Sequence, residues 1–449
     1  MPQSGETISV QLHGDFYILV VTMSAKQKPL TIVIFGATGD LAVKKLFPSL
    51  VALFNKGLIP TGSRVVAVSR RKWTDGEFRS FITGSVSVPE ALLGSLFYSE
   101  VEFDASHGYN ELVSRLKALD QEHGATEWLV YLSLAPQFYK KVIEGIRQSK
   151  LLSKATSKLL IEKPFGVDEV SAKALNRLVM SFLKHEQIYR VDHYLGKETV
   201  RALARIHESG PWLSTMLSSQ TVESIRIALF ESIGIEKRGA SYEGVGAFRD
   251  VAQNHLFAVL SVLAVTPPRT TGSIAWHHAR AKVISSLIPP KKTCELSRRG
   301  QYVGYTKEVG VQESSQTETA FEVITSFASG KLSGVPITIQ AGKKMPRSHV
   351  FVEVLMKKES GLKRMFFDIQ PEQKIILEYP DHVSETVLPK QHDAYEYIFM
   401  DAFAGNRSHF VGGTEVVASW KYTDRIVACW NVVPLESYDD KKPFIVEKP

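Results

Sequence analysis

The sequence predicts an α/β domain with a doubly wound parallel sheet, followed by an α+β domain built on a large, mainly antiparallel sheet. Strand and helix patterns alternate from residue 30 to about residue 190, and later strands follow one another without helices between them. The chain has 449 residues, too many for a single core. We therefore expect a tail at residues 1–29, a first domain at residues 30–190 and a second at residues 191–449.

A fully apolar strand at residues 31–35 opens the first domain, and such a strand is typical of the buried centre of a parallel sheet. The helix that follows ends at Gly57 and contains Pro48. Because proline removes a backbone hydrogen bond, we expect that helix to start irregularly. The remaining elements are expected as strands at residues 64–69, 129–134 and 157–161 and as helices at residues 137–148 and 168–185.

The second domain shows strands whose apolar residues alternate with polar ones, as in a sheet with one covered face. These strands are expected at residues 224–230, 320–324, 337–340 and 349–355. A long helix is expected from Phe248 to Leu263, and another at residues 393–408.

The composition favours a protein that handles a small anionic molecule. The net charge is +7 and the pI is about 9.1, but lysine and arginine are scattered, whereas a nucleic-acid groove needs a dense basic stripe. No apolar run approaches the length of a membrane span. With only two cysteines, we expect no disulfide framework and a cytoplasmic location. Residues 1–22 are either a tail or lie upstream of a true start at Met23.

A glycine turn follows the first strand. Gly36 and Gly39 enter a helix, where free amides and the helix dipole suit a phosphate. The spacing is G-x-x-G rather than the full dinucleotide fingerprint, and a tight turn alone explains the glycines nearly as well. The next strand, however, ends at Arg70, where an NAD-selective site would place a carboxylate. We therefore predict a Rossmann-like domain that binds NADP along Gly36, Thr38, Gly39, Asp40 and Leu41, with Arg70 and Thr38 at the 2′-phosphate.

Residues 191–199 place four reactive side chains close together. If the segment is helical, His193 and Lys197 are four residues apart and face the same way. With Tyr194 they would suit a phosphate, which leaves Asp192 for a different role. A solvated helix surface with ordinary charge pairs is the alternative interpretation.

Two further motifs carry candidate residues. Lys163 follows a strand within Glu162-Lys163-Pro164-Phe165-Gly166, at the sheet edge where ligands of α/β proteins collect. On the helix of residues 248–256, His255 shares an apolar stripe, where burial would keep the imidazole neutral as a general base requires. Asp192 is the candidate carboxylate that orients it. A loop lysine and a core histidine are the structural alternatives.

Together these motifs resemble those of the glucose-6-phosphate dehydrogenase family, over most of the chain from Thr31 onward. The similar segments are GATGDLA at residues 36–42, EKPFG at 162–166, YRVDHYLGKE at 189–198, FRDVAQNHL at 248–256 and GK at 342–343.

The resemblance implies an oxidoreductase of the oxidative pentose phosphate pathway. In its reaction His255 removes the proton from the anomeric hydroxyl of glucose 6-phosphate, Asp192 orients His255, and C1 delivers hydride to NADP. The residues it implies for the substrate are His193, Tyr194 and Lys197 at the phosphate, Glu231, Asp250 and Lys343 at the sugar, and Lys163 and Lys45 beside the cofactor. It implies a homodimer or homotetramer, and the reaction needs no metal because the nicotinamide takes the electrons.

Two alternative functions stay open at this point. One is a sugar oxidoreductase of the glucose–fructose oxidoreductase type, which shares a Glu-Lys-Pro motif but normally shows the full glycine fingerprint. The other is a non-catalytic sensor that binds NADP and has kept the fold.

Overall fold

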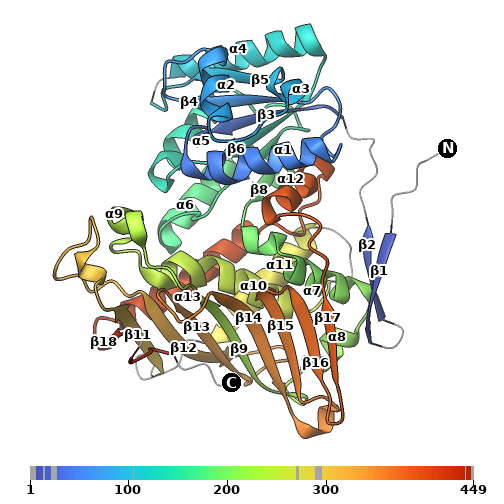
Figure 1. Cartoon of the computed structure of the whole chain (residues 1–449), viewed down its shortest axis with the longest axis vertical. Coiled ribbons are helices and arrows are strands. Elements are labelled where there is room, and N and C mark those ends of the chain that lie inside the picture. The colour runs from blue at the N-terminus through green and yellow to red at the C-terminus, as the bar shows by residue number, and fades with distance from the viewer. Residues whose placement is uncertain are drawn as a thin grey trace. The chain divides into compact units, whose positions relative to one another are not determined.

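A computed structural model describes residues 7–13, 16–21, 28–104, 106–268, 273–288, 296–439 and 441–445 (Figure 1). The chain divides into two compact units. Unit 1 comprises Met1–Glu6, Val21–Gly196 and His392–Gly413, and unit 2 comprises Thr7–Val20, Lys197–Gln391 and Thr414–Pro449.

Unit 1 contains the doubly wound parallel sheet that the sequence predicts. Its six strands run in the order β5-β4-β3-β6-β7-β8, and every neighbouring pair is parallel. The strand order reverses between β3 and β6, where such sheets bind ligands beyond their carboxyl ends. The strands are β3 (Leu30–Phe35), β4 (Arg64–Ser69), β5 (Leu96–Glu100), β6 (Glu127–Leu132), β7 (Lys158–Ile161) and β8 (Ile188–Arg190).

The first helix of unit 1 starts irregularly, as Pro48 predicts. A π-helix, η1 (Ala42–Leu46), precedes α1 (Phe47–Asn55), and Pro48 lies in the first turn of α1. The other helices before residue 197 are α2 (Asp75–Thr83), α3 (Glu90–Leu93), α4 (Ser106–His123), η2 (Pro136–Phe138), α5 (Tyr139–Gln148), α6 (Glu169–Met180), η3 (His185–Gln187) and η4 (His193–Gly196).

A late segment of the chain completes unit 1. Helix α12 (Ala394–Ala404) buries Ile398, Phe399 and Phe403 in the same apolar cluster as Leu46 of the first helical segment. The sequence places this helix at residues 393–408 within the second domain, whereas contact clustering groups it with the parallel sheet. Its apolar side chains are buried almost all round, so the helix packs where it is surrounded by core.

Unit 2 is built on a sheet of ten strands, in the order β17-β16-β15-β14-β9-β13-β12-β11-β18, with β10 paired to β12. Most pairs are antiparallel, but β9–β13 and β11–β18 are parallel. The strands are β9 (Val222–Phe230), β10 (Leu287–Ile288), β11 (Ser297–Tyr302), β12 (Ala320–Phe327), β13 (Pro336–Gly342), β14 (His349–Met356), β15 (Arg364–Gln370), β16 (Lys374–Glu378), β17 (Val383–Val387) and β18 (Leu435–Tyr438).

Helices of unit 2 pack against this sheet. The long helix expected from Phe248 begins as a π-helix, η6 (Phe248–Leu256), and continues as α10 (Phe257–Ala264). Segment η6 contacts β9 and β13, and α7 (Glu198–Ser209) contacts β15. The remaining helices are α8 (Trp212–Met216), η5 (Glu236–Arg238), α9 (Gly239–Tyr242), α11 (Ser273–Ser285), η7 (Tyr305–Lys307), η8 (Lys358–Ser360) and α13 (Gly413–Cys429).

Two features differ from the expectations at the chain ends. Where a tail is expected, β1 (Thr7–His13) and β2 (Phe16–Val21) form a two-stranded sheet. Cys429 is disulfide-bonded, a single bond that the sequence analysis did not predict when it expected no disulfide framework. Cys294, the other cysteine, lies outside the described residues. No helix of the described ranges is long and apolar enough to cross a membrane.

Gly166 is predicted to be essential for the stability of unit 1. It has φ +87°, and a Cβ there would lie 2.7 Å from the backbone nitrogen of Ala172. Gly166→Ala should lower the free energy of unfolding by about 3 kcal/mol, because backbone strain adds to the steric overlap. Urea denaturation measures the change.

Gly124 provides the matched control, since it has φ +94° but nothing within 4 Å of a built Cβ. Gly124→Ala should therefore cost only the strain, about 1 kcal/mol. Equal losses for the two variants would contradict the steric argument.

Candidate active site

The turn after β3 has a backbone that only glycine fits. Gly36 has φ +78°, and a Cβ there would collide with the carbonyl oxygen of Ser133. The Gly36 amide donates to the carbonyl of Val68 over 2.9 Å, and the Gly39 amide donates to the carbonyl of Gly36 over 2.9 Å. The turn thus holds the chain close to the ends of neighbouring strands before η1 begins.

A cavity of about 430 Å³ lies beside this turn, within unit 1. It brings together four of the predicted cofactor residues: Gly36, Thr38, Gly39 and Arg70. The other lining residues are Ser69, Arg71, Glu102, Phe103, Ser133, Leu134, Ala135 and Phe138. The cavity therefore occupies the ends of β3, β4 and β6, the edge where parallel sheets bind dinucleotides.

Aromatic rings hold Arg70 at this cavity. Its guanidinium lies 5.5 Å from the centroid of Phe103 and 5.2 Å from that of Phe138. The guanidinium of Arg71 instead lies 4.7 Å from the centroid of Trp73. Sequence reasoning missed Phe103 and Phe138, because each follows a different strand and no motif marks either one.

Other predicted cofactor residues lie on η1 or just before it. Asp40 forms an exposed ion pair of 2.8 Å with Lys44, and Leu41 is half-buried. Lys45 is exposed on η1. None of Asp40, Leu41 and Lys45 is among the residues that line the described cavity.

Lys163 lies directly beyond β7, and the peptide bond between Lys163 and Pro164 is cis. Its neighbour Glu162 is buried, and burial raises the pKa of the Glu162 carboxyl to about 7 although the hydrogen bond from Tyr131 lowers it. The Tyr139 hydroxyl donates to the Glu162 carbonyl over 2.8 Å. The backbone next to Lys163 is therefore held in place by the buried residue Glu162.

The segment of residues 191–199 is not one continuous α-helix. The Asp192 carboxylate accepts the Tyr194 amide over 3.0 Å at the start of the short 3₁₀-helix η4. Lys197 has extended backbone angles and forms the N-cap of α7. The i,i+4 helical relation expected between His193 and Lys197 is therefore wrong, because the helix ends and restarts between them.

His193 has an aromatic neighbour that sequence reasoning missed. Its ring stacks on Tyr395 of α12, with centroids 5.9 Å apart and an angle of 11° between the planes. It also contacts the ring of Tyr194, at 4.8 Å and 57°. Tyr395 is about 200 positions away in the sequence, so only the tertiary fold reveals this pairing.

In unit 2, three predicted substrate residues form one charged cluster. The buried ammonium of Lys343 lies 2.5 Å from a carboxylate oxygen of Glu231 and 3.5 Å from one of Asp250. Glu231 follows β9 and Lys343 follows β13, and these strands are parallel neighbours, so both side chains leave the same edge. Such paired charges offer hydrogen-bond donors and acceptors to the hydroxyls of a sugar.

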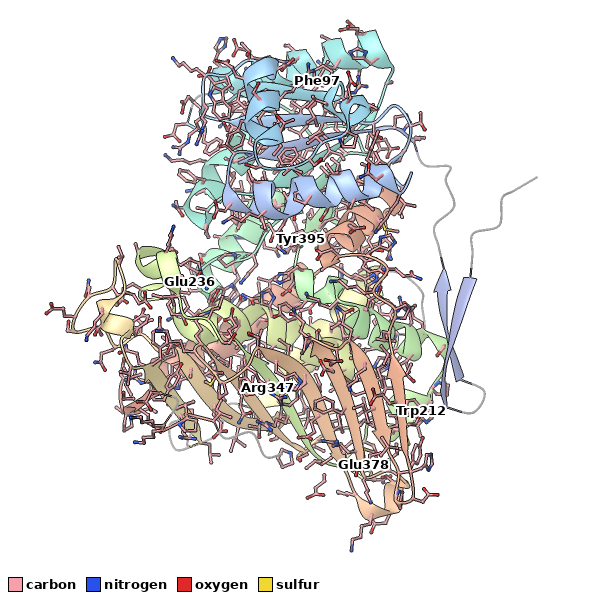
Figure 2. All side chains as sticks on the ribbon, in the orientation of Figure 1. Phe97, Trp212, Glu236, Arg347, Glu378 and Tyr395 are labelled. Carbon is pink, nitrogen blue, oxygen red and sulfur yellow. The ribbon has the colours of Figure 1, made fainter. Side chains whose placement is uncertain are left out.

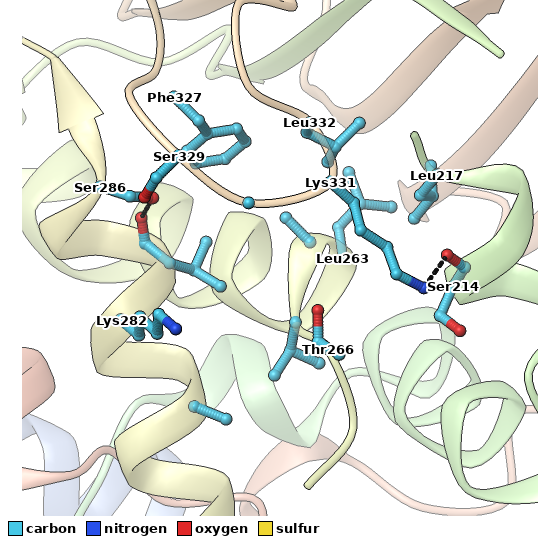
Figure 3. Close-up of a pocket in the computed structure, with 15 residues that line it drawn as sticks. Ser214, Leu217, Leu263, Thr266, Lys282, Ser286, Phe327, Ser329, Lys331 and Leu332 are labelled. Carbon is cyan, nitrogen blue, oxygen red and sulfur yellow. Dashed lines mark hydrogen bonds between the residues drawn. The ribbon is translucent and has the colours of Figure 1, made fainter. Parts of the chain in front are cut away.

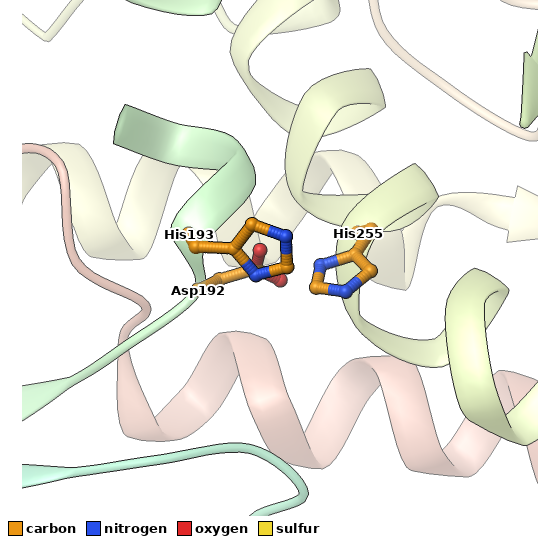
Figure 4. Close-up of side chains that lie close together, drawn as sticks. All are labelled: Asp192, His193 and His255. Atoms are coloured by element: carbon orange, nitrogen blue, oxygen red, sulfur yellow. The ribbon is translucent and has the colours of Figure 1, made fainter. Parts of the chain in front are cut away.

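His255 and Asp250 lie on η6, whose hydrogen bonds run from residue i to residue i+5. Residues five apart are thus about one turn apart, and the two side chains lie nearer to one face than in an α-helix. His255 projects from this helix, whereas Asp192 and His193 follow β8 (Figure 4). π-Helical turns are rare and frequent at functional sites.

A buried carboxyl group that sequence reasoning passed over supports η6. Glu318 accepts the Phe248 amide over 3.1 Å, at the start of the π-helix. Burial raises the pKa of the Glu318 carboxyl to about 7. The sequence segment TETAF, at residues 317–321, was the available signal.

A second cavity, of about 340 Å³, lies elsewhere in unit 2 (Figure 3). Leu263, Phe327 and Leu332 give it apolar walls, and the Lys331 ammonium donates to the Ser214 carbonyl over 2.9 Å beside it. The residues that line it include none of the predicted site residues.

Arg347 lies exposed in the turn between β13 and β14 (Figure 2).

Models of one known protein family match most of the chain. A model of the glucose-6-phosphate dehydrogenase NAD-binding domain matches residues 33–202, and a model of the C-terminal domain of the same family matches residues 207–443.

Individual relatives are similar along most of their length. Glucose-6-phosphate 1-dehydrogenase of Helicobacter pylori (strain J99) is 31% identical over 421 residues, which cover 91% of this chain and 95% of that one. The enzyme of Chlamydia muridarum is 30% identical and covers 90% and 91%. A solved glucose-6-phosphate dehydrogenase in complex with its substrate glucose 6-phosphate superposes with a TM-score of 0.83, at 25% identity, over 95% and 96%. The chain therefore belongs to the glucose-6-phosphate dehydrogenase family.

Proposed function

We propose that this chain oxidises glucose 6-phosphate at C1 to 6-phosphogluconolactone and transfers the hydride to NADP, the first step of the oxidative pentose phosphate pathway. The observation that carries the proposal is the charged cluster of Lys343, Glu231 and Asp250, in which Asp250 lies on the same π-helix as His255. Relatives named glucose-6-phosphate 1-dehydrogenase match about nine-tenths of the chain, which supports the same activity here.

The cavity of unit 1 fits an NADP cofactor. Glycine backbone at Gly36 and Gly39 permits close approach of a pyrophosphate, and Arg70 and Thr38 supply a cation and a hydroxyl for the 2′-phosphate. Bound there, the nicotinamide supplies the hydride acceptor. We assign Lys163 to the side of the cofactor that meets the substrate, with Lys45, Asp40 and Leu41 beside it.

The proton chemistry belongs to the protein. His255 takes the proton from the anomeric hydroxyl as general base, and Asp192 orients the imidazole and stabilises its cation. As that proton leaves, the C1–H bond breaks and its electron pair departs as hydride.

The remaining residues hold the substrate. Glu231, Asp250 and Lys343 bind sugar hydroxyls, which places C1 relative to His255. We assign His193, Tyr194 and Lys197 to the 6-phosphate. The strong charge of the phosphate then supplies binding energy remote from the reacting carbon.

The resemblance to the glucose-6-phosphate dehydrogenase family also leads us to propose that the protein is cytoplasmic and forms a homodimer or homotetramer. The outward side of the large sheet supports association, because Ile324 and Leu355 expose apolar surface there.

The decisive experiment mixes purified protein with glucose 6-phosphate and NADP and follows the absorbance of the reduced nicotinamide. The absorbance of the reduced nicotinamide is expected to increase steadily with time. Tight binding of NADP without turnover would instead identify a non-catalytic sensor, and preference for an unphosphorylated sugar would identify a different sugar oxidoreductase.

His255→Asn should lower kcat by about 10³-fold, the usual contribution of a general base, and leave the affinity for glucose 6-phosphate nearly unchanged. Steady-state kinetics and equilibrium binding measure the two effects. His278→Asn is the matched control, because His278 is exposed on α11 and should leave kcat unaltered. A mild loss in His255→Asn would mean that another group is the base.

Arg70→Ala should weaken NADP binding by about 10- to 100-fold, since a charge-assisted phosphate contact is lost, and should weaken NAD binding much less. Titration with each cofactor gives the ratio. Arg79→Ala is the control and should change the ratio little, because Arg79 does not line the cavity and its guanidinium lies 5.9 Å from the centroid of Phe97. Equal losses of NADP and NAD affinity in Arg70→Ala would refute the 2′-phosphate role.

A further inference from the structure

The backbone that carries the Lys343 side chain turns sharply after β13. The next residue, Lys344, has φ +50°, a left-handed conformation that a lysine rarely adopts. Such a conformation persists only where the surrounding structure holds it, and it is frequent at functional sites. Because the buried ammonium of Lys343 contacts Glu231 and Asp250, the backbone of this turn determines where that ammonium lies.

Hydrogen bonds hold this turn at three points. The Lys343 amide donates to the Thr319 carbonyl over 3.0 Å, and the Lys344 amide donates to the Ile233 carbonyl over 3.0 Å. The Lys343 carbonyl accepts the Tyr438 hydroxyl over 2.7 Å. Of these three bonds, only the one from Tyr438 comes from a side chain, so it is the one that a substitution can remove.

A short chain of hydrogen bonds fixes the Tyr438 hydroxyl in turn. It lies 2.9 Å from the Thr319 hydroxyl, which accepts the Tyr302 amide over 2.9 Å. The proton of Tyr438 is used at the Lys343 carbonyl, so the Thr319 hydroxyl is the donor to Tyr438. The Gly300 carbonyl lies farther from the Thr319 hydroxyl, at 3.5 Å. Each hydroxyl therefore donates once and accepts once.

The surroundings of Tyr438 keep its hydroxyl a donor. Tyr438 and Thr319 are both buried, and the ring of Tyr438 packs in one apolar cluster with Tyr302 and Phe444. Burial raises the pKa of the Tyr438 hydroxyl, which therefore stays protonated at any pH suited to an assay. Tyr438 ends β18, which pairs with β11, so a strand from the end of the chain reaches the turn after β13.

We propose that Tyr438 is a positioning residue for the sugar: its hydroxyl, held by Thr319, fixes the backbone of Lys343 and thereby the ammonium that meets the sugar hydroxyls. The inference rests on the proposed function, because that function assigns Lys343 to the sugar. The competing role is to stabilise the edge of the sheet alone, and it predicts a loss of stability without a change in substrate affinity.

Tyr438→Phe keeps the ring and removes the hydroxyl. It should raise KM for glucose 6-phosphate about fivefold, the effect of losing one neutral hydrogen bond, with kcat within about twofold. KM for NADP and the inhibition constant of inorganic phosphate should stay unchanged, because we assign both ligands to residues other than Lys343. Steady-state kinetics with inorganic phosphate as the competitor measures all four quantities.

Thr319 provides a second test of the same chain of hydrogen bonds. Thr319→Val removes the hydroxyl that holds Tyr438 and should raise KM for glucose 6-phosphate, whereas Thr319→Ser keeps a hydroxyl and should restore it. Combining Thr319→Val with Tyr438→Phe should raise KM no further than the larger single effect, because both act through one contact. Tyr305→Phe is the matched control, since Tyr305 is buried in the same cluster but its hydroxyl donates to Glu243 over 2.9 Å.

The outcomes separate this inference from the proposed function. An unchanged KM for glucose 6-phosphate in Tyr438→Phe, with only a lower midpoint of urea denaturation, would overturn the inference. Equal weakening of glucose 6-phosphate and inorganic phosphate would also overturn it, because the effect would then lie at the phosphate. Absence of turnover by the unaltered protein would refute the proposed function alone, since calorimetric titration with glucose 6-phosphate and with inorganic phosphate still compares the variants.

Discussion

The buried ammonium of Lys343 is the constraint on which the substrate side of this protein depends. A buried cation is stable only when acceptors surround it, and Glu231 and Asp250 provide two carboxylates. One carboxylate follows β9 and the other lies on η6, so the ion pairs tie a parallel strand pair to the helix that carries His255. Removing either carboxylate would leave the ammonium less compensated, so the groups that we propose to bind the sugar hold one another in place before any ligand binds.

Local patterns predicted the parts of the fold that depend on local physics. The strand at residues 31–35 was predicted because a strand buried on both faces is mainly apolar. The turn at Gly36 was predicted because its backbone conformation, and the close approach of the Ser133 carbonyl oxygen, leave room only for glycine. Arg70 was singled out because it follows the next strand directly, and it lines the cavity beside the glycine turn; its role at the 2′-phosphate stays a prediction. The family assignment is confirmed by both family models.

Tertiary contacts decided the rest. Helix α12 is apolar almost all round, so its periodicity could not show that it would pack with the parallel sheet rather than with its sequence neighbours. The nine-residue π-helix η6 brings Asp250 and His255 closer to one face than an α-helix would, and no periodicity in the sequence indicates a π-helix. Tyr395 stacks on His193 from a distant segment, which residue spacing within a motif cannot reveal.

Each unit also contains a buried glutamate whose pKa is raised, Glu162 in unit 1 and Glu318 in unit 2, and the two have the same thermodynamic consequence. The folded pKa of Glu162 and of Glu318 is raised to about 7, above the value of an exposed glutamate. Their contribution to stability is therefore fully present below the unfolded pKa and is lost as the pH rises through about 7. Near neutrality the fold gives up part of this stability to hold a tyrosine in one unit and the start of η6 in the other. Such a loss of stability is tolerated where the exact position of side chains matters more than stability. The proposed site has this requirement, because it must align the hydride acceptor, the general base and the substrate phosphate.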